Sequence, residues 1–229
     1  MTYPSFSEIS KNFAPGWFAS VMGTGVLALT TLHLSHEQSW LEPVAWGLHY
    51  FNLLWFAVLA LPWLWRWLAF REAAVNTLKH PLQANFYPTF SIALLVIALQ
   101  WLQFGQHVVV ALWFWWSGAL LTYAFSFAIL FHMFRGESVT LDHVTPAKYI
   151  PAVGLVVMPL AGAPLLAHTS GLLHEVILLM NVLGFGAGAM TYLALLSLVS
   201  FRKYLHKPAL GILTPTVWIQ LAQIGRAHV

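Results

Sequence analysis

Residues 15–26 read Pro-Gly-Trp-Phe-Ala-Ser-Val-Met-Gly-Thr-Gly-Val, an apolar stretch interrupted by one proline, three glycines and two hydroxyl side chains. The stretch lies within a longer apolar run that is predicted to cross a membrane. In hydrocarbon every backbone N–H and C=O group needs a partner, so kinked or bare backbone is tolerated only where other helices or a water-filled cavity cover it. We therefore expect this span to line an internal path rather than to face lipid.

The composition of the whole chain is typical of an α-helical membrane protein. Of its 229 residues, 59% are hydrophobic and only 7% are charged, whereas an ordinary soluble domain is about 25% charged. The chain has no cysteine, which excludes disulfides, thiolate metal sites and cysteine nucleophiles. Its formal net charge of +3 is too small to indicate a nucleic-acid partner.

Hydropathy divides the chain into six spans and the start of a seventh, and several runs reach the roughly 20 residues that a helix needs to cross a bilayer. The six spans are predicted at about residues 14–34, 44–70, 87–104, 108–134, 150–167 and 176–201, and the seventh opens near residue 209. The connections are too short to hold a soluble domain. The sequence thus predicts an all-α, polytopic membrane protein in which residues 1–222 form one transmembrane domain.

The last seven residues have a different origin in this interpretation. Residues 223–229, Gln-Ile-Gly-Arg-Ala-His-Val, resemble the translation of a common sequencing adapter. Arg226 would also interrupt an apolar segment that has just begun, and an arginine at the middle of a span is costly. We expect the native sequence to reach only Ala222 here, inside a helix, so that the transmembrane domain is incomplete.

The basic residues predict the orientation of the chain. With these spans all of them before the last segment fall on one side, whereas the loops on the other side carry Glu37, Glu42 and Glu175 and no basic residue. The nine residues are Lys11, Arg66, Arg71, Lys79, Arg135, Lys148, Arg202, Lys203 and Lys207. The positive-inside rule then places the N-terminus in the cytoplasm, and we expect a multi-pass protein of the bacterial inner membrane.

Prolines indicate an internal repeat. Pro15, Pro88, Pro151 and Pro215 stand near the cytoplasmic starts of spans 1, 3, 5 and 7, at separations of 73, 63 and 64 residues. We expect each proline to kink its helix and each repeat to be a helical hairpin. The odd spans carry most of the small residues, which allow close backbone approach, so they are expected at the centre, with the Leu- and Trp-rich spans 2 and 4 facing lipid. The alternative is that proline and glycine are simply frequent in membrane helices.

Four motifs, taken together, resemble one family of transporters. They are residues 15–26, His80-Pro81 followed by Phe86-Tyr87-Pro88-Thr89, then Pro151-Ala152-Val153-Gly154, and finally Leu213-Thr214-Pro215-Thr216-Val217-Trp218-Ile219. In this order they resemble the tellurite-resistance/dicarboxylate transporter family, and the resemblance covers residues 11–222. The family includes bacterial tellurite-resistance proteins, fungal malate permeases and sulfite efflux pumps, and plant slow anion channels.

The resemblance implies ten membrane helices in five hairpins, with the odd helices around a central pore, and assembly as a homotrimer in the lipid bilayer. It implies transport of anions, either C4-dicarboxylates such as malate or small inorganic anions such as sulfite, nitrate and chloride. Helices 8 to 10 and the phenylalanine that blocks the pore on the ninth helix of relatives are absent from this chain. We therefore assign the function to the parent protein.

A pore of this kind favours anions when bent helices direct their positive dipole ends toward it. No lysine or arginine lies deep in an odd span. The residues expected to line the path are Phe18, Ser20, Gly23, Thr24, Thr89, Ser91, Gly154 and Thr216. The alternative is that Phe18 and the hydroxyl groups pack against neighbouring helices, each hydroxyl bonding to the preceding turn.

Other classes of function remain open from the residues alone. His49 and His132 lie in spans 2 and 4, and two buried histidines could bind a haem, although no HExxH motif or acidic cluster accompanies them and we expect no cofactor or metal. A helical scaffold without transport is a third class. The chain has no GxxxxGK(S/T) phosphate loop, so transport is expected to be passive or driven by an ion gradient. The odd spans hold no mid-membrane carboxylate or histidine, which favours a channel or uniporter over a proton-coupled carrier.

Overall fold

The computed structural model describes residues 4–135, 140 and 143–205, and in these residues the regular elements are helical. Six of the helices are long and apolar enough to cross a membrane, so the chain is an all-α, polytopic membrane protein as predicted. The six spans comprise Pro15–Leu34, Leu41–Ala69, Gln83–Gln103, Val108–Arg135, Pro146–Leu166 and Gly171–Leu205. The seventh span, Pro215, Thr216 and residues 223–229 lie outside the described residues.

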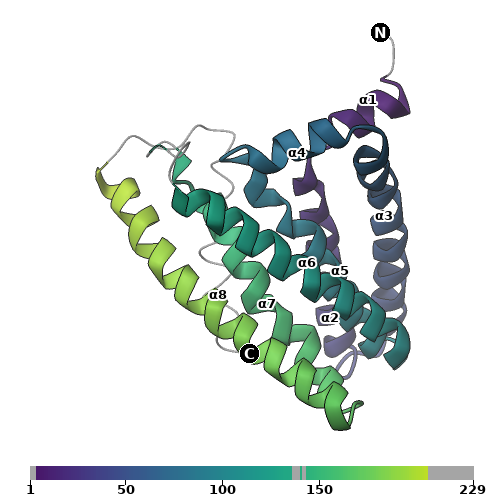
Figure 1. The fold of residues 1–229 in the computed structure, drawn as a ribbon. Coiled ribbons are helices and arrows are strands. Elements are labelled where there is room, and N and C mark those ends of the chain that lie inside the picture. The colour runs from purple at the N-terminus through teal and green to yellow at the C-terminus, as the bar shows by residue number, and fades with distance from the viewer. Residues whose placement is uncertain (1–3, 136–139, 141–142, 206–229) are drawn as a thin grey trace.

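The spans form three antiparallel hairpins (Figure 1). The first pairs α2 (Phe18–Leu34) with α3 (Leu41–Ala69), the second α5 (Pro88–Gln103) with α6 (Val108–Arg135), and the third α7 (Tyr149–Leu166) with α8 (Gly171–Leu205). Two shorter helices, α1 (Phe6–Lys11) and α4 (Arg71–Lys79), lie at one end of the bundle. We call this the basic end, because most of the lysines and arginines gather there, and the other end the acidic end.

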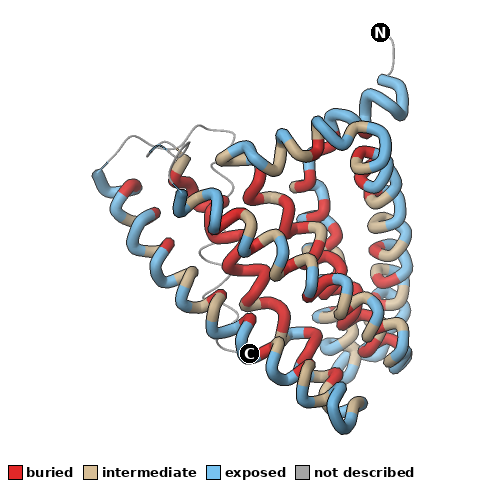
Figure 2. The backbone as a smooth tube through the Cα atoms, in the orientation of Figure 1, coloured by how far each residue is buried: buried red, intermediate tan, exposed pale blue. Residues whose placement is uncertain are grey.

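Each hairpin contributes one inner and one outer helix. The inner helices α2, α5 and α7 form a row, with α5 packed against both neighbours, and the outer helices α3, α6 and α8 lie against that row. In the apolar window of the span that contains α5, 78% of the residues are buried, against 67% for α7 and 22–28% for the three outer helices. Figure 2 shows the same contrast between the centre and the outside. The central position predicted for odd spans therefore holds for α5 and α7.

The first odd span differs from this expectation. Only 28% of the window around α2 is buried, because α2 stands at the edge of the row and contacts α5 on one side only. One face of α2 is consequently uncovered in the described part of the chain.

The inner spans begin with a 3-10 turn rather than an α-helix. These turns are η1 (Pro15–Trp17), η2 (Gln83–Phe86) and η4 (Pro146–Lys148), and each leads into an inner helix of only 16 to 18 residues. A helix of 16 residues is about 24 Å long, shorter than the roughly 30 Å hydrocarbon core. The inner spans thus reach across the membrane only together with their 3-10 turns.

The predicted proline kinks take the form of helix starts. Pro15 is the first residue of η1, Pro88 the first residue of α5 and Pro151 the third residue of α7. At the first turn of a helix proline loses no hydrogen bond, since that N–H group has no partner within the helix. Pro146, which opens η4, is the structural counterpart of Pro15, whereas Pro88 and Pro151 stand in the α-helices that follow η2 and η4. In the described residues the repeat is therefore clearer in the 3-10 turns than in the predicted prolines.

Close packing between helices depends on glycine at several contacts. A Cβ atom at Gly118 of α6 would lie 3.0 Å from the Ser91 carbonyl oxygen of α5, and one at Gly188 of α8 would lie 2.8 Å from the Ala152 carbonyl oxygen of α7. Both positions leave no room for a side chain, so the second and third hairpins are held together at small residues, as in many membrane proteins.

Candidate functional site

The inner helices all begin at the basic end, so their positive dipole ends point to the same side of the bundle. The spans Pro15–Leu34, Gln83–Gln103 and Pro146–Leu166 contain no aspartate or glutamate. The start of this row therefore presents partial positive charge with no carboxylate of its own to neutralise it.

The predicted path residues of α2 divide between a packed and an uncovered position. Phe18 is fully buried, and its ring meets Phe90 of α5 edge to face with centroids 4.9 Å apart. The Ser20 hydroxyl donates to the Trp17 carbonyl (2.7 Å) and accepts from Trp55 Nε1 (2.8 Å). Phe18 and Ser20 thus join α2 to its neighbours.

The uncovered face of α2 carries the remaining predicted residues of that helix. Gly23 is exposed and Thr24 is half-buried. A Cβ atom at Gly23 would meet nothing within 4 Å. These two positions, with the exposed side of Ser20, are the part of the predicted path that stays open in the described chain.

Thr89 and Ser91 are buried, and their hydroxyl groups join helices. Thr89 Oγ1 donates to the carbonyl oxygens of Pro15 (2.7 Å) and Phe86 (2.6 Å). Ser91 Oγ donates to the Pro88 carbonyl (3.0 Å) and accepts from Thr122 Oγ1 of α6 (2.8 Å). Thr89 therefore ties α5 to the start of α2, and Ser91 ties it to α6.

Gly154 of α7 lies at the same junction as Ser91. A Cβ atom there would lie 3.1 Å from Thr122 Cγ2 and 3.4 Å from Ile92 Cγ1. These contacts are of the packing kind weighed as the alternative for the hydroxyl groups. The assignment of these residues to a path stays a prediction. The last predicted path residue, Thr216, lies outside the described residues.

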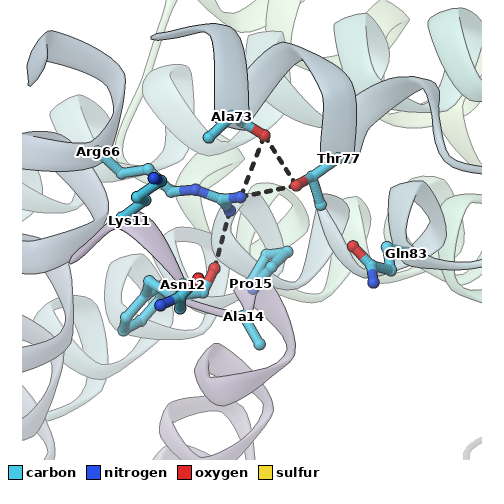
Figure 3. A pocket seen from close by; sticks show the side chains of 9 residues that line it. Lys11, Asn12, Ala14, Pro15, Arg66, Ala73, Thr77 and Gln83 are labelled. Atoms are coloured by element: carbon cyan, nitrogen blue, oxygen red, sulfur yellow. Dashed lines mark hydrogen bonds between the residues drawn. The ribbon is translucent and has the colours of Figure 1, made fainter. Parts of the chain in front are cut away.

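A pocket of about 410 Å³ opens at the basic end beside the start of α2 (Figure 3). Its polar lining includes Lys11, Arg66, Thr77 and Gln83, and no carboxylate contributes to it. The Arg66 guanidinium lies between α4 and the residues that precede α2. It donates to the Thr77 hydroxyl (2.6 Å) and to the carbonyl oxygens of Phe13 (2.8 Å) and Ala73 (3.2 Å).

Sequence reasoning missed two buried polar features. Arg66, Lys148 and Arg202 are 3–7% exposed, whereas in the sequence they indicated only the orientation of the chain in the membrane. Asn52 of α3 donates to Gln100 of α5 (2.8 Å), and both side chains are fully buried. The separations of 69 and 67 residues between Arg66, Arg135 and Arg202 show in the sequence that these arginines recur at equivalent places, but Arg135 is exposed, so the spacing alone did not predict which cations are buried.

The two histidines of the haem hypothesis lie near opposite ends of α5. The His49 ring stacks on Phe104, with centroids 4.5 Å apart, just beyond the C-terminal end of α5. His132 lines a small cavity with Pro81 and Ala84, next to the N-terminal end of α5. Since α5 is about 24 Å long, one haem iron cannot bind both. Within the described residues no three His, Cys, Asp or Glu side chains form a possible metal site.

Comparison with known proteins finds a family model and two relatives that each match most of the chain. A family model described as voltage-dependent anion channel matches residues 12–228. An uncharacterized transporter of Methanocaldococcus jannaschii is 45% identical over 218 residues, 95% of this chain and 63% of the relative. A second uncharacterized transporter of that organism is 43% identical over 215 residues, 94% of this chain and 63% of the relative.

More distant similarity extends to fungi. A sulfite efflux pump of Arthroderma otae is 25% identical over 204 residues, 86% of this chain and 54% of the pump. The chain spans less than two-thirds of the length of each of these three relatives.

Proposed function

The chain belongs to the voltage-dependent anion channel family, and on this basis we propose that its parent protein carries anions across a membrane along the row of inner helices α2, α5 and α7. The family consists of channels and transporters rather than enzymes. Family membership supports anion transport in general, and the choice of anion, the path and the assembly are finer parts of the same proposal.

One observation carries the proposal that the path favours anions. Three inner helices start at the same end of the bundle with their positive dipole ends, and their spans contain no carboxylate. An anion approaching these starts meets an attractive field from oriented backbone N–H groups. The same field repels a cation, so the helix starts select ions by charge without a lysine inside the path.

For the substrate we propose small inorganic oxyanions such as sulfite, with nitrate, chloride and C4-dicarboxylates such as malate as competitors. The similarity to a sulfite efflux pump supports sulfite. We further propose passive or gradient-driven transport by a homotrimer in the plasma membrane, with the basic end in the cytoplasm. The distribution of lysine and arginine supports this orientation.

Anion flux into liposomes tests the function. The full-length parent protein is reconstituted, and uptake of sulfite, nitrate, chloride and malate is compared with that of empty liposomes and with uptake of potassium. We expect anion uptake above the empty control, no potassium uptake, and an order among the anions that names the substrate. Equal uptake by liposomes with and without the protein, for all four anions, would overturn the proposal.

A further inference from the structure

Three buried cationic side chains donate to three equivalent backbone carbonyl groups. Each acceptor lies two residues ahead of one of the 3-10 turns η1, η2 and η4. The bonds join Arg66 Nη1 to the Phe13 oxygen (2.8 Å), Lys148 Nζ to the Pro81 oxygen (2.7 Å) and Arg202 Nη1 to the Val144 oxygen (2.7 Å). The start of every described inner helix is therefore held by one cation.

The cations meet a need that the local backbone creates. Ahead of each 3-10 turn the regular α-helical ladder has not begun, so these carbonyl groups need partners from outside the helix. The Pro81 oxygen has a second one, because it also accepts from Asn85 Nδ2 (3.0 Å). Each segment opens an apolar span, where an unpartnered carbonyl is costly. Hydrogen bonds from charged donors are shorter and stronger than neutral ones, so they suit a point that must stay fixed.

Topology alone does not account for these three side chains. Arg71 and Lys79 are exposed on the same side of the bundle, and exposed cations suffice for the positive-inside effect. Arg66 and Lys148 are instead 4% and 3% exposed, and burial of a charge is costly unless it brings specific interactions. Their burial points to a role that the exposed residues do not have.

The held segments are also linked to one another across the inner row. Thr89 at the start of α5 donates to the Pro15 carbonyl of η1 (2.7 Å). Lys148, the last residue of η4, donates to the Pro81 carbonyl ahead of η2. The starts of α2, α5 and α7 are therefore linked in one continuous rim, so a displacement of one start would displace the neighbouring starts.

We propose that Arg66, Lys148 and Arg202 are positioning residues that hold this rim, and that the rim sets the width of the basic-end mouth of the anion path. The inference rests on the proposed function for its transport consequence, whereas the positioning itself is independent of it. The second hairpin has its own variation: Arg135, at the place corresponding to Arg66, lies over the Phe131 ring at 5.8 Å, and the bond to Pro81 comes from Lys148.

The first test measures flux per folded molecule in liposomes that contain the full-length parent protein. Lys148→Met and Arg66→Met remove the donors, Lys148→Arg and Arg66→Lys restore a charged donor, and Lys79→Met and Arg71→Met are exposed matched controls. We expect the two buried methionine variants to lose about tenfold in flux, as for loss of a charge-assisted hydrogen bond, and to change the chloride-to-malate ratio. The conservative variants should recover most of the flux, and the controls should stay within about twofold, as exposed single charges usually do.

The ratio of two anions separates positioning from mere stability. A residue that only stabilised the fold would lower the amount of folded protein and leave the ratio per folded molecule unchanged. If Lys148→Met and Arg66→Met match Lys79→Met and Arg71→Met in both flux and ratio, the inference is overturned while the proposed function stands.

The second test needs no transport. Ala84, in η2, is 6% exposed and lines a small cavity with Lys148 and Pro81. In a cysteine-free parent carrying Ala84→Cys, maleimide should label the cysteine slowly, and Lys148→Met should accelerate labelling at least fivefold, whereas Arg71→Met, at an exposed position outside this cavity, should not. Equal labelling rates in the three backgrounds would overturn the inference even if the wild-type protein carried no anion at all.

Discussion

At the scale of single residues, the uncovered face of α2 is where the predicted path is most directly testable. Gly23 has free space around it, so a larger side chain there should not disturb the fold. We expect Gly23→Leu to lower anion flux at least tenfold by filling the path, with an unchanged melting temperature. The measurement is flux in liposomes with the full-length parent protein.

The matched control places the same bulk on an outer helix. Ala124 of α6 is exposed, and α6 is predicted to face lipid, so Ala124→Leu should leave the flux as it is. Equal flux in Gly23→Leu and the wild type would show that this face of α2 is turned to lipid, and Ser20, Gly23 and Thr24 would leave the set of path residues.

A second prediction at this scale concerns the buried amide pair. Asn52 Nδ2 donates to Gln100 Oε1 inside the apolar contact of α3 with α5. We expect Asn52→Ala to lower the free energy of unfolding by about 1–2 kcal/mol, because Gln100 Oε1 loses its donor in apolar surroundings. Thermal or denaturant unfolding in detergent micelles measures the change.

Replacing both partners isolates the hydrogen bond from the packing. Asn52→Leu combined with Gln100→Leu removes both polar groups and should recover most of the loss. Gln103→Ala, at an exposed position three residues further along, should change little. A double variant that is less stable than either single variant would contradict this account and indicate a packing role for the amides.

At the scale of the helices, glycine contacts decide how closely the inner row packs. A Cβ atom at Gly25 of α2 would lie 2.5 Å from Val96 Cγ1 and 2.9 Å from Asn52 Nδ2, so α2, α3 and α5 meet there. We expect Gly25→Ala to lower the free energy of unfolding by about 1–3 kcal/mol through overpacking.

Gly23→Ala is the comparison on the same helix. Its added methyl group meets nothing, so helix propensity alone applies and the variant should be neutral or more stable by up to about 1 kcal/mol. Unfolding in detergent measures both variants side by side. If the two glycines respond alike, close approach of α2 to α5 does not depend on Gly25.

Helices were the part of the fold that the sequence predicted best. Apolar runs separated by short polar segments fix the existence of each span, and all six predicted spans agree with the structure to within a few residues. Which side of an inner helix meets which neighbour was not predictable, because α5 is apolar all round and is buried on all sides. From the sequence alone, Thr89 and Ser91 were therefore predicted to line the path. In the structure their hydroxyl groups bond to carbonyl oxygens and to Thr122.

The buried cations show why the rest of the site was missed. A lysine or arginine at the end of a span is expected at the membrane surface, and nothing in its identity tells whether it also reaches a carbonyl of another segment. Arg66 and Phe13 are 53 residues apart, and Lys148 and Pro81 are 67 residues apart. Only the packed hairpins bring these pairs together.

At the scale of the whole molecule, the charge distribution predicts which end faces which compartment. Within the described residues, Lys79 and Arg71 lie at the basic end, and Glu37 and Glu175 lie in or beside the turns of the acidic end. By the positive-inside rule we predict that the basic end faces the cytoplasm, which would let the rim described above meet anions from the cell interior.

Because these 229 residues contain no cysteine, orientation can be measured with single cysteines introduced into a cysteine-free parent. In intact cells a membrane-impermeant maleimide should label Glu37→Cys, and Lys79→Cys should react only after the membrane is made permeable. Both positions are exposed, so a difference in labelling reports the side of the membrane rather than burial. The reverse labelling pattern would show that the basic end faces outward. The positive dipole ends of α2, α5 and α7 would then meet anions that enter from outside, so the rim would serve uptake rather than release.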